Sequence, residues 1–241
     1  MSLIVYGDLT QLLSLVASLR TDALIAEGRA VEWRAVVGAP TTTVVSRPRS
    51  DAARREITEV AACWHDSALP GEPVGVHAPG FVPAAGPPAA AYAEAVGAGI
   101  GDHVRHLLFT NYWRDQEDIG NPDHLRRLLT VPILHGNSNA DVLREYGYVV
   151  QIAGGPVTSA AWRLRHAWET AWDGLGRPEL PAVTDGTDSY AGHDAIRYLG
   201  TLGEAPHTFA DGNPYPLPPM PLAARRLDRI RPGLRPSWRD A

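Results

Sequence analysis

The sequence predicts an α/β fold in which a βαβ unit and a later ββα unit are separated by a large, all-helical insertion. Three observations support this prediction. A helical segment near the N-terminus lies between two strand-like segments, helical periodicity dominates residues 50–176, and strand-like segments return after that block. We therefore expect one α/β domain from residues 1–49 and 177–203, a helical insertion domain from residues 50–176, and a Pro-rich C-terminal extension over residues 204–241.

The first three elements form the βαβ unit. Leu3–Tyr6 is apolar at every position, which is typical of a strand covered on both faces. Apolar residues then recur at helical spacing, and we expect Asp8 or Thr10 to cap the first turn and Gly28 to end the helix. Val31–Ala35 alternates like a strand, so the two strands are expected to lie parallel with a right-handed crossover.

The same kind of pattern predicts the insertion and the second unit. Helices are expected in the insertion at Asp51–Trp64, Ala89–Ala98, Asp102–Trp113, Pro122–Leu129, Ala140–Tyr146 and Ser159–Leu175. Farther on, Leu180–Val183 and Ser189–Ala191 have the character of two strands joined by a turn, and His193–Leu202 is expected to form the last helix. Together these elements have the plan of the thioredoxin-like fold.

The composition argues against several classes of partner. The formal net charge of -5 would repel a polyphosphate, so nucleic acid is not expected to bind. No uncharged apolar stretch reaches the roughly 18 residues needed to cross a bilayer, and residues 1–8 lack the features of a signal peptide. We therefore expect a cytoplasmic protein that does not bind membranes. All 22 basic residues are arginine, a bias that indicates a GC-rich bacterial genome.

Several short motifs occur in the order found in one superfamily. They are Tyr6-Gly7-Asp8, Val31–Ala35, Leu108–Trp113, Asp118–Pro122, Leu180-Pro181 and Gly192–Ile196. On these residues the chain resembles the DsbA-like proteins, which include FrnE-type oxidoreductases, 2-hydroxychromene-2-carboxylate isomerases and kappa-class glutathione transferases. The resemblance covers roughly residues 3–202 and implies the thioredoxin-like fold, with a cis peptide bond between Leu180 and Pro181.

The resemblance also implies a site at the start of the first helix. Relatives carry Cys-x-x-Cys, Cys-x-x-Ser or a leading serine there, whereas this chain has Gln11-Leu12-Leu13-Ser14 and a single cysteine, Cys63. The implied catalytic positions are Gln11 and Ser14, and the implied substrate-binding positions are Leu12, Leu13, Leu180, Pro181, His193 and Asp194. Ser14 lies one turn inside the helix, and this position favours a structural hydrogen bond between its hydroxyl and the backbone.

Three functions remain open. The first is a cysteine-independent isomerase or biosynthetic tailoring enzyme that acts on a small organic molecule. The second is a non-catalytic binding protein that docks a protein partner on Leu12 and Leu13, and the third is residual thiol-dependent oxidoreductase chemistry, which the missing thiols argue against. No cofactor is certain, although Asp194 could pair with the ammonium group of a low-molecular-weight thiol or could charge the first turn of its helix. A homodimer is compatible with all three.

Other residues that could carry chemistry have simpler interpretations. Cys63 is expected to be buried as a packing residue, and His103 and His106 to form surface or inter-helix hydrogen bonds rather than a metal site. Gly136–Ala140 is a loose variant of a nucleophile elbow, but its second glycine is missing and Pro132 argues against a central strand before it. A packing stripe is expected from Trp162, Trp168 and Trp172.

Overall fold

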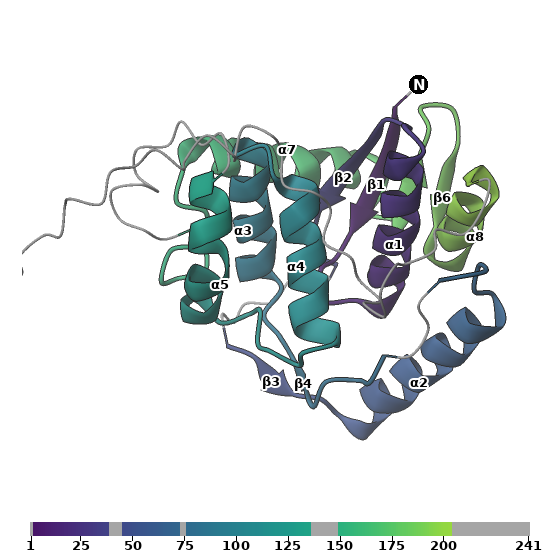
Figure 1. Ribbon diagram of the computed structural model, residues 1–241, viewed down its shortest axis with the longest axis horizontal. Helices are drawn as coiled ribbons and strands as arrows, with labels where there is room; N and C mark the ends of the chain where they lie inside the picture. Colours follow the sequence, from purple (N-terminus) through teal and green to yellow (C-terminus); the bar gives the residue numbers. More distant parts are fainter. Residues whose placement is uncertain (1, 39–44, 73–75, 136–148, 204–241) are drawn as a thin grey trace, which may run out of the picture.

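The computed structural model describes residues 2–38, 45–72, 76–135 and 149–203. Within them, a four-stranded mixed sheet carries the predicted βαβ and ββα units, and most helices of the insertion lie together on one side of it (Figure 1). Among the described helices, none combines the length with the apolar character that a membrane span requires.

The sheet is built around its first strand. β1 (Leu3–Gly7) pairs in parallel with β2 (Val31–Ala35) and antiparallel with β5 (Ala182–Thr184), and β6 (Ser189–Ala191) pairs with the far side of β5. The resulting strand order is β2-β1-β5-β6. Because β1 is an inner strand that is covered by helices, the apolar run noted in the sequence lies in the core.

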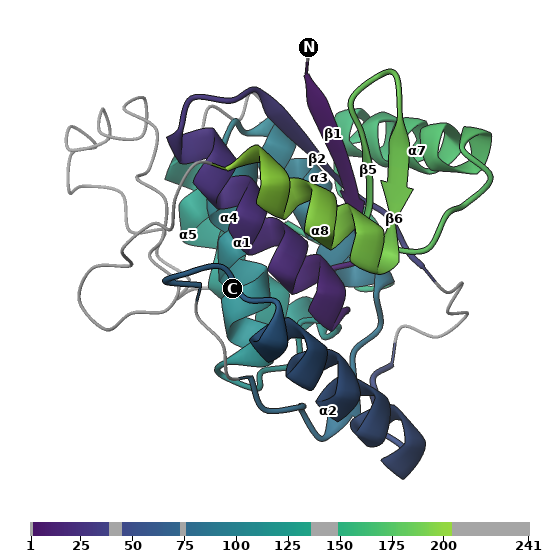
Figure 2. The same cartoon turned by 90° about the vertical axis from the view of Figure 1, so that its right-hand side faces the viewer.

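Two helices of the α/β unit pack side by side. They are α1 (Leu12–Ala26) and α8 (Gly192–Leu202), whose axes lie next to one another in Figure 2. The predicted end of α1 is confirmed, because Gly28 has a φ of +84° and its amide donates a hydrogen bond of 2.9 Å to the Ile25 carbonyl. A left-handed residue just after the last turn is a common helix ending, and glycine adopts that conformation without strain.

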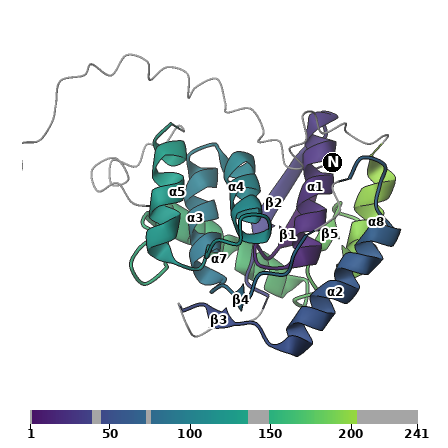
Figure 3. The same cartoon turned by 60° about the horizontal axis from the view of Figure 1, so that its bottom comes forward.

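The insertion is mostly helical, as predicted. Its described helices are α2 (Asp51–Asp66), α3 (Gly86–Gly97), α4 (Gly101–Trp113), α5 (Pro122–His135) and α7 (Ser159–Gly174). α3, α4 and α5 lie together, whereas α2 lies apart from them beside α1 (Figure 3). A two-stranded ribbon, β3 (Arg47–Pro48) with β4 (Phe81–Val82), was not predicted. Strands of two residues are too short to show an alternating pattern.

One predicted boundary in the insertion is wrong. α5 does not end near Leu129 but continues through Pro132 to His135, so the apolar segment before Gly136 is helical rather than strand-like. This removes the strand that a nucleophile elbow requires. The elbow-like residues Gly136–Ala140 and the helix expected over Ala140–Tyr146 lie outside the described residues.

A buried ion cluster joins α1 to α4. The side chain of Arg105 is fully buried, forms ion pairs with Asp22 and Asp102, and lies 5.1 Å from the ring centre of Trp33. Burial disfavours the charged guanidinium, but the two carboxylates outweigh it and raise the pKa of Arg105. His106 Nδ1 lies 3.1 Å from Asp22 Oδ2, which confirms the inter-helix interpretation of this histidine.

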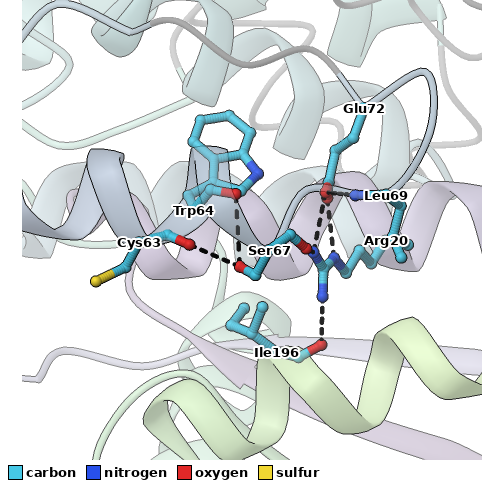
Figure 4. Close-up of polar contacts among 7 residues, drawn as sticks. All are labelled: Arg20, Cys63, Trp64, Ser67, Leu69, Glu72 and Ile196. Carbon is cyan, nitrogen blue, oxygen red and sulfur yellow. Dashed lines mark hydrogen bonds and ion pairs between the residues drawn. The ribbon is translucent and has the colours of Figure 1, made fainter.

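A second buried ion pair fixes the segment after α2 onto the α/β unit (Figure 4). Arg20 of α1 and Glu72 form two hydrogen bonds of 2.9 Å, and each side chain is only 4% exposed. The same guanidinium donates to the carbonyl groups of Ile196 in α8 and Ser67, at 2.7 and 3.1 Å. Glu72 also accepts the Leu69 amide at 2.9 Å. Arg20 therefore ties three separate parts of the chain to one point.

Candidate functional site

The site implied by the sequence begins at the N-terminus of α1. Gln11 is the N-cap residue, and its side chain makes no capping hydrogen bond. The expected caps are therefore wrong: Asp8 accepts hydrogen bonds from the amide and hydroxyl of Thr10, at 2.9 and 2.7 Å, rather than from the first turn of the helix. An uncapped first turn has amide groups and a positive dipole end that favour an anion or a carbonyl oxygen.

Asp8 is a residue of this region that the sequence analysis considered only as a cap. Its side chain is buried, and it accepts a third hydrogen bond from the Gly38 amide at 2.9 Å. Burial raises the pKa of Asp8, while the hydrogen bonds from Thr10 and Gly38 oppose that rise. Asp8 therefore joins the start of α1 to the segment that follows β2. No local pattern marks such a contact, because Asp8 and Gly38 are brought together only by the βαβ crossover.

Gly38 is the point at which the predicted site residues meet. A Cβ atom on Gly38 would lie 2.9 Å from Gln11 Nε2, 3.2 Å from Leu180 Cδ1 and 3.5 Å from Asp8 Oδ2. The amide group of Gln11 and the side chain of Leu180 therefore both lie next to a position that has no side chain. Only glycine leaves room for this approach without displacing one of them.

The proline loop completes this region. The Leu180-Pro181 peptide bond is cis, as predicted. The Pro181 carbonyl accepts a hydrogen bond of 2.8 Å from the Gly192 amide, so the start of α8, with His193 and Asp194, adjoins the loop. Both side chains are exposed, and Asp194 forms an ion pair of 2.7 Å with Arg197. The structure thus brings Gln11, the proline loop and the start of α8 into one region.

Two of the three remaining predicted residues of the first helix, Leu12 and Ser14, are buried. Ser14 is fully buried, and its Oγ accepts a hydrogen bond of 3.1 Å from the Asp8 amide. This contact is a hydrogen bond between the Ser14 hydroxyl and the backbone, as predicted from the position of Ser14 in the helix. Leu12 is only 5% exposed and belongs to the core, whereas Leu13 is partly exposed and packs against the core. Gln11 is therefore the more accessible of the two implied catalytic residues.

Two other expectations are wrong. Cys63 is exposed on α2 rather than buried, because α2 buries little of its surface and Trp64 is its one buried residue. Trp162 is 61% exposed and does not join the packing stripe, whereas Trp168 and Trp172 are each 3% exposed and do. No group of three or more potential metal ligands occurs among the residues that the structure describes.

A pocket of about 260 Å³ lies on the outer face of α7. It is lined by Gly155, Pro156, Trp162, Arg165, His166 and Glu169. Glu169 Oε1 accepts a hydrogen bond of 3.2 Å from the Val37 amide, one residue before Gly38. This group was not predicted from the sequence. The helical spacing of Trp162, His166 and Glu169, which places them on one face of α7, is the signal that could have indicated it.

No protein-family model matches the sequence, and the search of curated proteins found no significant match. Solved structures do match the fold. The cytosolic disulfide reductase DsbM from Pseudomonas aeruginosa, solved with GSH, is 14% identical, with 84% of this chain and 98% of that chain covered and a TM-score of 0.51. A protein from Nitrosomonas europaea, provisionally described as a protein disulfide isomerase, is 15% identical over 83% of this chain and 96% of that chain, with a TM-score of 0.53.

A third similar structure belongs to another reaction class. It is 2-hydroxychromene-2-carboxylate isomerase, which is 12% identical, with 84% of this chain and 94% of that chain covered and a TM-score of 0.52. At such identities, the similarity concerns the fold and not the chemistry. The chain therefore has the thioredoxin-like fold of the DsbA-like proteins, and with a single cysteine it cannot carry a Cys-x-x-Cys pair.

Proposed function

We propose that the chain is an enzyme that works without cysteine, an isomerase or a biosynthetic tailoring enzyme, and that its small organic substrate binds between Gln11 and the Leu180-Pro181 loop. The observation that carries this proposal is the meeting of Gln11 Nε2 and Leu180 at Gly38, at the N-terminus of α1. An amide donor beside an uncapped helix start can bind a carbonyl oxygen, and an apolar side chain can contact the rest of the substrate.

In the proposed reaction, the Gln11 side-chain amide donates a hydrogen bond to the substrate carbonyl and stabilises negative charge that develops there. Gln11 has no proton to exchange at neutral pH, so it polarises the carbonyl and does not act as an acid or a base. Asp8 is a positioning residue, because its buried carboxyl holds Thr10 and Gly38 beside Gln11. Leu180 is only 5% exposed, so it shapes the wall beside Gln11 from within the core.

The docking alternative has less support than the enzyme. It relied on an apolar surface made by Leu12 and Leu13, and Leu12 is buried. Leu13 alone offers little area for a protein partner. If the chain is nevertheless a docking module, Leu13→Asp should abolish partner binding while Gln11→Ala has little effect.

A low-molecular-weight thiol such as glutathione is the co-substrate that we propose to test. His193 and Asp194 adjoin the proline loop, and a carboxylate there can pair with an ammonium group. Asp194 already pairs with Arg197, so a thiol would compete with that contact. Cytoplasmic location, expected from the sequence, would supply such a thiol in reduced form.

The first test measures turnover of 2-hydroxychromene-2-carboxylate, with and without reduced glutathione, because an isomerase of this compound shares the fold. Gln11→Ala and Gln11→Glu, which both remove the donor, should lower kcat by about 100-fold while the melting temperature stays unchanged. Cys63→Ser should have no effect. Turnover that survives both Gln11 variants would contradict the proposed role. Insulin reduction that is catalysed by the wild type and lost in Cys63→Ser would instead show thiol chemistry.

A further inference from the structure

The pocket on α7 is lined by residues that take no part in the proposed reaction at Gln11. α7 directs Trp168 and Trp172 into the core, whereas Trp162 and His166 line the pocket on its outer face. Pro156 lines the pocket from the segment before the helix. Gln11, Leu180 and Pro181 are not among its lining residues, so it is a second location on the molecule.

The wall of this pocket includes an exposed aromatic surface. The rings of Trp162 and His166 lie one helical turn apart, with their centres separated by 6.2 Å and their planes inclined by 34°. Trp162 is 61% exposed, although tryptophan has one of the largest apolar surfaces to bury. A large aromatic side chain that is left exposed in a concavity is typical of a ligand-binding surface. Flat rings of this kind bind other planar molecules by stacking.

The two charged residues of the pocket, Glu169 and Arg165, differ in whether they already have partners. Glu169 is already engaged, because its Oε1 accepts the Val37 amide and its Oε2 lies 3.9 Å from Arg177 Nη2. Arg165 has no hydrogen bond or ion pair with the described residues, although it is partly buried. A guanidinium group is a planar fork of donors that suits carboxylate and phosphate oxygens. The pocket therefore offers an available positive charge next to an aromatic wall.

We propose that the α7 pocket binds a planar aromatic molecule that carries one anionic group, with the ring against Trp162 and the anion on Arg165. Carboxylates and phosphates share this chemistry, and both fit the donor geometry of arginine. The proposal goes beyond the reaction at Gln11 and does not depend on it, since the two locations have different lining residues.

The test is a calorimetric titration of the full chain with 2-naphthoate and, in parallel, with 2-naphthyl phosphate. Arg165→Gln and Trp162→Ala should each weaken binding by about tenfold or more, because one removes the charge and the other removes the aromatic wall. The matched control is Arg163→Gln, the same substitution at an exposed residue of α7 that does not line the pocket. The control should bind like the wild type, and neutral 2-naphthamide should bind about tenfold more weakly than the carboxylate.

Three results would overturn the proposal. The first is the absence of binding by both anions at millimolar concentration in the wild type. The second is equal weakening by Arg163→Gln and Arg165→Gln, which would indicate a general charge effect. The third is binding that depends on Gln11 but not on Trp162 or Arg165, which would place the ligand at the proline loop. Matching melting temperatures show that the variants remain folded, and the anion that binds more tightly identifies the preferred group.

Discussion

Replacing Arg20 with methionine is expected to lower the free energy of unfolding by about 3–5 kcal/mol, because it leaves the Glu72 carboxylate buried without its counter-ion. Both side chains are 4% exposed, so water cannot replace the lost partner. The substitution also removes the donors to the carbonyl groups of Ile196 and Ser67. Urea unfolding of the wild type and the variant, followed by circular dichroism, measures the difference.

The matched control is Arg54→Met. Arg54 is 51% exposed and lies 3.9 Å from Asp51, so its loss should change the free energy of unfolding by no more than about 1 kcal/mol. The double variant Arg20→Met with Glu72→Leu should recover part of the stability, since no charge is then left buried. Equal losses for Arg20→Met and Arg54→Met would show that the buried pair is not a major source of stability.

Replacing Glu94 with alanine is expected to lower the free energy of unfolding by about 2–4 kcal/mol. Glu94 is 3% exposed, and its carboxylate accepts the amides of Val157 and Thr158, each at 2.7 Å, and the Thr158 hydroxyl at 2.8 Å. Thr158 is the N-cap of α7, so the carboxylate also lies at the positive end of that helix. Without this carboxylate, the amides of Val157 and Thr158 and the Thr158 hydroxyl lose their acceptor.

Glu94→Gln should be less damaging than Glu94→Ala, because the side-chain amide keeps one acceptor oxygen of the same size. Glu59→Ala, at an exposed position of α2, is the control for loss of a carboxylate and should change stability by about 0.5 kcal/mol or less. Chemical denaturation compares all three variants. Because Pro156 lies directly before the anchored residues, Glu94→Ala should also weaken 2-naphthoate binding at the α7 pocket. A Glu94→Ala protein as stable as Glu59→Ala would contradict the proposed anchoring.

Much of the fold could be predicted because its signals are local. The apolar run of β1 and the alternation of β2 are visible within five residues each, and the helical periods of α1 and α4 repeat over several turns. Motif order then linked these elements to one superfamily and predicted the cis bond at Leu180-Pro181. The position of the candidate site could be predicted in part for the same reason, since Gln11 and the proline loop occupy recognisable positions in the sequence.

By itself, the sequence determined the order and type of the main elements and the absence of a Cys-x-x-Cys pair. Only the tertiary structure decided which side chains are covered: it buried Leu12 and Ser14, and it left Cys63 and Trp162 exposed. It also paired Arg20 with Glu72, 52 residues away along the chain. The physical reason is that periodicity shows that a helix has an apolar face, whereas burial depends on which other elements pack against each part of that face.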